Sequence, residues 1–101
     1  VWNTPLARTF EAIVIAPHVY PIGSSDNRLW DREELRELII EATLAFRVDP
    51  DRIVVTGLSS GSIATQELLR YSKDLVAAGM PGAFQYLYGR SPCQFDDVPV
   101  W

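Results

Sequence analysis

Two unlike patterns meet at residues 57–61, and this junction constrains the fold more than any other feature of the chain. Before it, Ile53 to Thr56 has the sequence I-V-V-T, a β-branched run typical of a short strand. After it, apolar residues recur at helical spacing from Ser60 to about Tyr71. A strand that passes directly into a helix must turn sharply. We therefore expect Ser59, at the centre of the turn, to have a strained backbone and an exposed hydroxyl.

The junction has the sequence Gly57-Leu58-Ser59-Ser60-Gly61, which matches G-x-S-x-G. Side chains two residues before and two residues after the serine would collide in such a turn, so we expect glycine to be required at both positions. The N–H of Ser60 is expected at a helix N-terminus, where it can stabilise a developing oxyanion. The pattern favours Ser59 as a nucleophile. The alternative is a glycine-rich turn in which Ser59 is an ordinary helix N-cap.

Composition and missing motifs exclude several other functions. The 101 residues include 9 Lys and Arg against 13 Asp and Glu, a net charge of −4, so nucleic-acid binding is not expected. No apolar stretch approaches the roughly 18 residues of a membrane-spanning helix. Cys93 is the only cysteine, so no disulfide can form within the chain. Without G-x-G-x-x-G or G-K-[ST], the dinucleotide and P-loop interpretations also fail.

Further strands are predicted on both sides of the junction. Glu11–Ala16, with the sequence E-A-I-V-I-A, predicts a strand buried on both faces. Leu75–Met80 predicts another strand, whose small residues would let a neighbouring element approach closely. Val98–Trp101 has the pattern of a further strand that is just beginning. Residues 17–28 and 82–97 are rich in turn formers and predict loops.

A helix is predicted to begin after Asp31, its expected N-cap, with Glu34 at capping-box spacing. Asp49-Pro50-Asp51 is expected to end it and turn the chain. The predicted apolar stripe consists of Leu35, Leu38, Ile39, Ala42, Ala45 and Phe46. The charged residues off this stripe are expected to form a solvated face; they are Arg36, Glu37 and Glu41.

The alternation of strands and helices predicts an α/β fold with a parallel sheet. Right-handed crossovers are expected to place helices on both faces of the sheet, which gives three layers. In such sheets, reactive groups collect at the carboxyl ends of the strands. The loop after Ala16 and the turn after Thr56 are expected to reach that edge.

Several short sequence motifs, spread along the chain from about Phe10 onward, occur in an order known from one protein family. They are Ile13-Val14-Ile15-Ala16-Pro17, Leu29-Trp30-Asp31, Val48-Asp49-Pro50-Asp51-Arg52-Ile53, Thr56-Gly57-Leu58-Ser59-Ser60-Gly61 and Asp97-Val98-Pro99-Val100-Trp101. In this order the chain resembles a central segment of an α/β-hydrolase, of the esterase, polyhydroxybutyrate-depolymerase-like or phospholipase/carboxylesterase type. The resemblance implies that residues 1–101 form one partial α/β-hydrolase domain, with its fourth, fifth and sixth strands and the start of a seventh.

The resemblance also implies a function. Ser59 would be the nucleophile and Ser60 N–H one oxyanion donor, acting on a small-molecule or polymeric carboxylic ester, with no metal or organic cofactor. The chain departs from the family at two positions beside the nucleophile. Ser60 stands where a bulky residue, often methionine, is usual, and Ser62 stands where a second glycine is usual. Both differences would change the side chains that line the site next to Ser59.

A serine nucleophile needs a general base and an orienting acid, which in this fold follow it as acid and then histidine. No histidine follows Ser59, and the acid is expected after the strand that begins at Val98. The second oxyanion donor is expected before Val1. We therefore expect the chain to be the middle of a longer domain, a view that its non-methionine start also favours.

Other residues have weaker claims to the site. His18 is the only histidine and is either a base in an unusual chain order or a residue of the site rim. Trp30 and Tyr20 either line a substrate pocket or pack between loop and helix. Cys93 is expected to be an incidental loop thiol. The aspartates expected to serve loops are Asp74, Asp96 and Asp97.

Two alternatives to an esterase stay open from the sequence. A peptidase or thioesterase of the same fold is possible, because the turn does not specify the leaving group. A non-catalytic α/β module, or a degenerate hydrolase relative, is the alternative from a different class. Such a module would need a partner strand at its exposed sheet edges.

The 101-residue chain by itself is predicted to hydrolyse esters slowly or not at all, because its general base, its acid and half of its oxyanion hole are expected elsewhere. The measurement is release of nitrophenol from a nitrophenyl ester by the purified chain. Rapid hydrolysis that disappears in Ser59→Ala would contradict this prediction.

Overall fold

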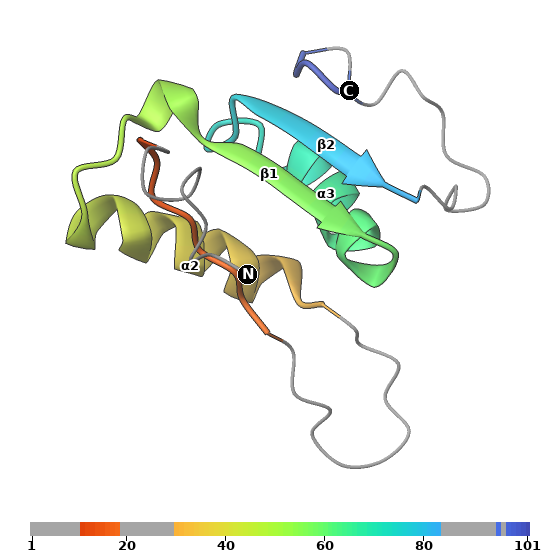
Figure 1. Cartoon of the computed structure of the whole chain (residues 1–101), viewed down its shortest axis with the longest axis horizontal. Helices are drawn as coiled ribbons and strands as arrows, with labels where there is room; N and C mark the ends of the chain where they lie inside the picture. The colour runs from red at the N-terminus through yellow and green to blue at the C-terminus, as the bar shows by residue number, and fades with distance from the viewer. Residues whose placement is uncertain (1–10, 19–29, 84–94, 96) are drawn as a thin grey trace.

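The computed structural model describes residues 11–18, 30–83, 95 and 97–101, and these form an α/β arrangement. The elements in chain order are α2 (Arg32–Ala45), the 3₁₀ helix η1 (Pro50–Arg52), β1 (Val54–Leu58), α3 (Ser60–Tyr71) and β2 (Ala78–Gly82), as Figure 1 shows. The α/β class predicted from the sequence is confirmed at this level. In these residues no helix is both long enough and apolar enough to cross a membrane.

The sheet is parallel and is centred on β1 and β2. Their register runs from Val54 opposite Ala78 to Leu58 opposite Gly82. A side-chain bond supplements the ladder, because Thr56 Oγ1 donates to the carbonyl oxygen of Met80 at 2.8 Å. Both strands therefore end at the same edge, the edge at which α3 begins.

The chain returns to the sheet at its C-terminal end. Val100 forms a parallel bridge with Gly79, and two backbone bonds flank it. Gly79 N–H donates to Pro99 at 3.0 Å, and Trp101 N–H donates to Gly79 at 3.1 Å. Residues 99–101 thus lie along the outer edge of β2, as expected for a strand that is just beginning.

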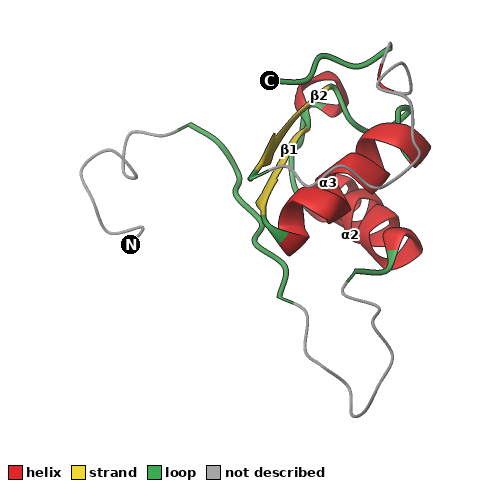
Figure 2. Cartoon of the chain, turned by 90° about the vertical axis from the view of Figure 1, so that its right-hand side faces the viewer, coloured by secondary structure: helices red, strands yellow, loops and turns green. Residues whose placement is uncertain are grey.

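Both α-helices lie on the same side of the strands, as Figure 2 shows, so the prediction of three layers is wrong for the described residues. The physical reason is topological. Right-handed crossovers place successive helices on opposite faces only where the strand order reverses. Here the order continues in one direction, from β1 to β2 to residues 99–101.

The strand predicted over Glu11–Ala16 is also absent. Residues 11–18 form no regular element, and Ile13 and Ile15 are 52% and 44% exposed. A strand that is apolar on both faces is stable only between two covering layers. Since the described helices cover one side of the sheet, this run has no second layer in which to be buried.

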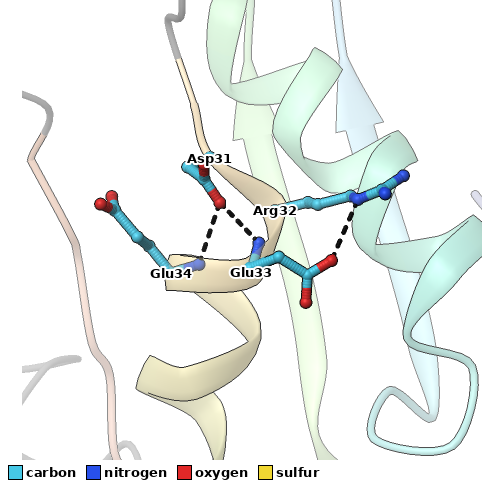
Figure 3. Close-up of polar contacts among 4 residues, drawn as sticks. All are labelled: Asp31, Arg32, Glu33 and Glu34. Carbon is cyan, nitrogen blue, oxygen red and sulfur yellow. Dashed lines mark hydrogen bonds and ion pairs between the residues drawn. The ribbon is translucent and has the colours of Figure 1, made fainter.

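The start of α2 is capped as predicted. The Asp31 carboxylate accepts the N–H of Glu33 at 2.8 Å and the N–H of Glu34 at 3.2 Å, as Figure 3 shows. These bonds satisfy two of the backbone donors that a helix start leaves without partners. In the same turn, Arg32 Nε donates to Glu33 Oε1 at 3.2 Å.

The apolar stripe of α2 is used only in part. Leu35 is buried and the stripe residues up to Ala42 are at least half-buried, whereas Phe46 is 52% exposed. The helix ends at Ala45, before the predicted stop. The D-P-D sequence instead forms η1, whose N-cap Asp49 accepts the N–H of Asp51 at 3.0 Å.

The core lies between α3 and the sheet, with one contribution from α2. Leu69 of α3 is fully buried and lies so close to Gly79 that a Cβ at that glycine would fall 2.6 Å from Leu69 Cδ1. This confirms the predicted close approach. Strand β2 begins three residues later than predicted, because the N–H groups of Leu75 and Val76 both turn back to the carbonyl of Ser72. The buried apolar cluster consists of Leu35, Ala64, Leu68, Leu69, Val76 and Val98.

Arg36, predicted on a solvated face, instead joins α2 to the turn before β2. Its guanidinium donates from both Nη atoms to the two carboxylate oxygens of Asp74, with Nη1 to Oδ1 at 2.8 Å. This bidentate geometry is favourable for a guanidinium and a carboxylate. The hydrogen bond from Arg36 lowers the pKa of Asp74, and desolvation opposes this shift without reversing it.

This ion pair predicts how stability depends on pH. Because the folded-state pKa of Asp74 is lowered, its contribution is present above the unfolded-state pKa and is lost as pH falls through the folded-state value. The unfolding midpoint of Asp74→Asn is expected to fall less than that of the wild type between about pH 6 and pH 3. Thermal denaturation followed by circular dichroism measures both slopes. Glu37→Gln is the control, since it removes one negative charge without removing an ion pair in the described residues; an equal change in slope would contradict the prediction.

Candidate active site

The turn from β1 into α3 has the geometry that the G-x-S-x-G sequence predicts. Strand β1 ends at Leu58, α3 begins at Ser60, and Ser59 alone joins them, with φ 55° and ψ −115°. A positive φ is uncommon for a residue with a side chain, and a sparsely populated conformation of this kind costs roughly 1–3 kcal/mol. Ser59 is exposed, and its hydroxyl makes no capping hydrogen bond. The interpretation of Ser59 as an ordinary side-chain N-cap is therefore wrong.

The two glycines of the turn have different roles. A Cβ on Gly57 would fall 2.9 Å from Gly61 Cα and closer still to the Gly61 carbonyl. Backbone atoms cannot rotate away as a side chain can, so Gly57 is required. A Cβ on Gly61 would meet nothing within 4 Å, apart from its own chain neighbours and the backbone of α3. The prediction that both glycines are required is thus confirmed at Gly57 and wrong at Gly61. A side chain at Gly57 would collide with the backbone of Gly61, whereas a side chain at Gly61 would collide with nothing near it.

Backbone hydrogen bonds fix Ser59 on both sides. Its N–H donates to the carbonyl of Gly82, at the end of β2, at 3.3 Å. Its carbonyl accepts the N–H of Ser62 at 2.9 Å. Ser60 follows in the first turn of α3, where N–H groups have no intrahelical acceptor. Ser59 therefore lies at the N-terminal end of α3, the positive end of the helix dipole.

The inner face of α3 beneath the turn is polar, which the apolar spacing did not predict. Ser62 is fully buried and accepts a hydrogen bond from Gln66 Nε2 at 3.4 Å. Thr65 is also buried and donates through Oγ1 to the carbonyl of Gly61 at 2.9 Å. The helical spacing of these three residues is a signal that a search for polar periodicity could have found. They tie the first two turns of α3 together under Ser59.

The remaining predicted site residues are placed as follows. His18 is exposed and ends the segment 11–18, which is not a strand, so the premise that placed it at the carboxyl edge of the sheet is wrong. Trp30 packs against the buried apolar cluster, which favours the alternative in which it packs between loop and helix. The residues outside the described ranges are Tyr20, Cys93 and Asp96.

Asp74 and Asp97 are engaged in ion pairs and are not placed at the turn. Asp74 is held by Arg36, and Lys73 Nζ lies 2.8 Å from Asp97 Oδ2. Lys73 lowers the pKa of Asp97, chiefly through this hydrogen bond. Both aspartates join separate elements, whereas the sequence predicted only local service to loops.

The described residues contain no group of three or more His, Cys, Asp or Glu placed to hold a metal ion. Among known proteins, no family model, no curated sequence and no solved structure matches this chain. The site is therefore defined by its own geometry: an exposed serine at a strained strand-to-helix turn, next to the N–H groups of a helix start.

The two glycines give a matched test of this geometry. Gly57→Ala is expected to destabilise the protein by about 3 kcal/mol or more, because backbone atoms must move. Gly61→Ala is expected to lie within about 1 kcal/mol of the wild type, on the stabilising side, since alanine favours helix. Urea denaturation of the two variants measures the difference. Equal losses of stability in the two variants would contradict the close approach of the Gly61 backbone to Gly57.

Proposed function

We propose that the protein is a serine hydrolase of the α/β-hydrolase type, acting on carboxylic esters with Ser59 as its nucleophile. One observation carries the proposal: Ser59 has a positive φ between a parallel strand and a helix, and it is an exposed residue whose hydroxyl is not used as a cap. Backbone strain of this kind is maintained where it serves a site. A turn without chemistry would be formed at less cost by glycine at this position.

The proposed reaction proceeds by acyl transfer. Ser59 Oγ bonds to the ester carbonyl carbon as its proton passes to a general base, and the carbonyl oxygen becomes an oxyanion. Ser60 N–H donates to that oxyanion. The bond to the alcohol oxygen then breaks, the alcohol leaves with the proton, and water releases the acid from Ser59. These steps require a base and an acid, which we assign to residues other than the ion-paired Asp74 and Asp97.

A second candidate, a non-catalytic α/β module that pairs with another chain, is favoured by a different observation. On the side of the sheet away from α3, large apolar side chains are more than half exposed; they are Val54 at 59%, Leu58 at 72% and Met80 at 51%. A surface of this kind is typical of contact with further protein. The two candidates differ in whether Ser59 is reactive.

A fluorophosphonate probe distinguishes them, because it forms a covalent adduct only with an activated serine. The probe is applied to the 101-residue chain and, since the base and acid are expected outside it, to any longer protein that contains it. An adduct on the tryptic peptide that carries Ser59 is expected in a protein that also supplies the base and the acid, and little or none is expected in the 101-residue chain alone.

The matched control is the neighbouring serine. Ser59→Ala is expected to abolish labelling, whereas Ser60→Ala keeps the backbone N–H and is expected to retain labelling within about threefold. No adduct in a folded protein that contains the base and acid would overturn the proposal and favour the non-catalytic module.

A further inference from the structure

A second residue with a positive φ, Ala83, follows the end of β2, the strand that pairs with β1. The parallel register pairs Leu58 with Gly82, so the next residues along the two strands, Ser59 and Ala83, are neighbours at the carboxyl edge. Ala83 has φ 49°. Among the described residues these two are the only non-glycine residues with positive φ.

The two residues are connected through the peptide unit between Gly82 and Ala83. Its carbonyl oxygen accepts the Ser59 N–H at 3.3 Å. The orientation of a peptide plane is set by the torsions on either side of it, here ψ of Gly82 and φ of Ala83. The φ of Ala83 sets how the following chain leaves this peptide plane, and a change in it must be taken up by ψ of Gly82, which sets where the Gly82 carbonyl points. It also turns the chain away as β2 ends.

We propose that Ala83 is a positioning residue for Ser59. Its left-handed backbone aims the Gly82 carbonyl at the Ser59 N–H, and this bond holds the turn in the conformation that exposes the hydroxyl. The inference rests on the proposed function for its catalytic consequence, but the anchoring itself can be measured whether or not Ser59 reacts. No sequence pattern indicates this residue, because alanine has no general preference for a positive φ.

Two substitutions separate backbone conformation from side-chain size. Ala83→Asn introduces a residue that tolerates the left-handed region, whereas Ala83→Val introduces a β-branched residue that strongly disfavours it. Amide hydrogen exchange of Ser59 is the first measurement, with the Leu69 amide in the core of α3 as the internal reference. Exchange at Ser59 is expected to accelerate about five- to tenfold in Ala83→Val and to change less than about twofold in Ala83→Asn. Leu69 is expected to be unaffected in both.

A direct measurement on the wild-type protein removes dependence on the folding of the variants. The NMR coupling across the hydrogen bond, from Ser59 nitrogen to the Gly82 carbonyl carbon, is expected to be observable. Its absence, or equal Ser59 exchange in the wild type and both variants, would overturn the anchoring.

Labelling kinetics test the catalytic consequence. With the fluorophosphonate probe, the maximal labelling rate is expected to fall about tenfold or more in Ala83→Val, while the probe concentration for half-maximal rate stays constant and Ala83→Asn resembles the wild type. An unchanged maximal rate in Ala83→Val would show that Ala83 is structural only. A wild-type protein that is never labelled, yet shows the exchange pattern, would overturn the proposed function and leave the anchoring intact.

Discussion

The fold of this protein depends on the approach of two backbone segments at the junction of β1 and α3. A side chain at Gly57 would collide with the backbone of Gly61, so the helix can start this close to the strand only because Gly57 has none. The direction of α3 follows from that start. It crosses back over both strands, and Leu69 reaches Gly79, where the lack of a Cβ allows a second close approach. Glycines at both ends of α3 thus set the distance between helix and sheet.

The same geometry places every feature of the candidate site at one edge. Parallel strands end together, so Ser59 and Ala83, both with a positive φ, follow the two strand ends at this edge. The bond from Ser59 N–H to Gly82 links the two strand ends. Beneath it, the buried Ser62 and its bond to Gln66 give the helix start a polar support in place of a purely apolar one. The proposed reactivity of Ser59 would depend on constraints of the backbone more than on contacts between side chains.

Local patterns predicted those parts of the structure that depend on nearest neighbours in the chain. The Asp31 cap, the strand before the junction and the helix after it all involve residues within about four positions of each other, where propensity and spacing are reliable. The prediction of a strand at Glu11–Ala16 was wrong because such a strand needs a second covering layer of the sheet, which no local pattern specifies. Likewise, Arg36 looked solvated because its partner, Asp74, lies 38 positions along the chain.

The sequence by itself therefore determined the sharp turn and the serine at its centre. The turn needs a residue without a side chain at Gly57, beside the backbone of Gly61, and both glycines lie within five adjacent residues. It could not determine which side of the sheet the helices cover, because that depends on the order in which strands join. Only the tertiary structure brought the end of β2, with Ala83, to the end of β1, because the paired residues of the two strands are 24 positions apart in the chain. It also decided that Gly61 contributes its backbone to the turn and not its missing side chain, because that distinction requires atoms in space.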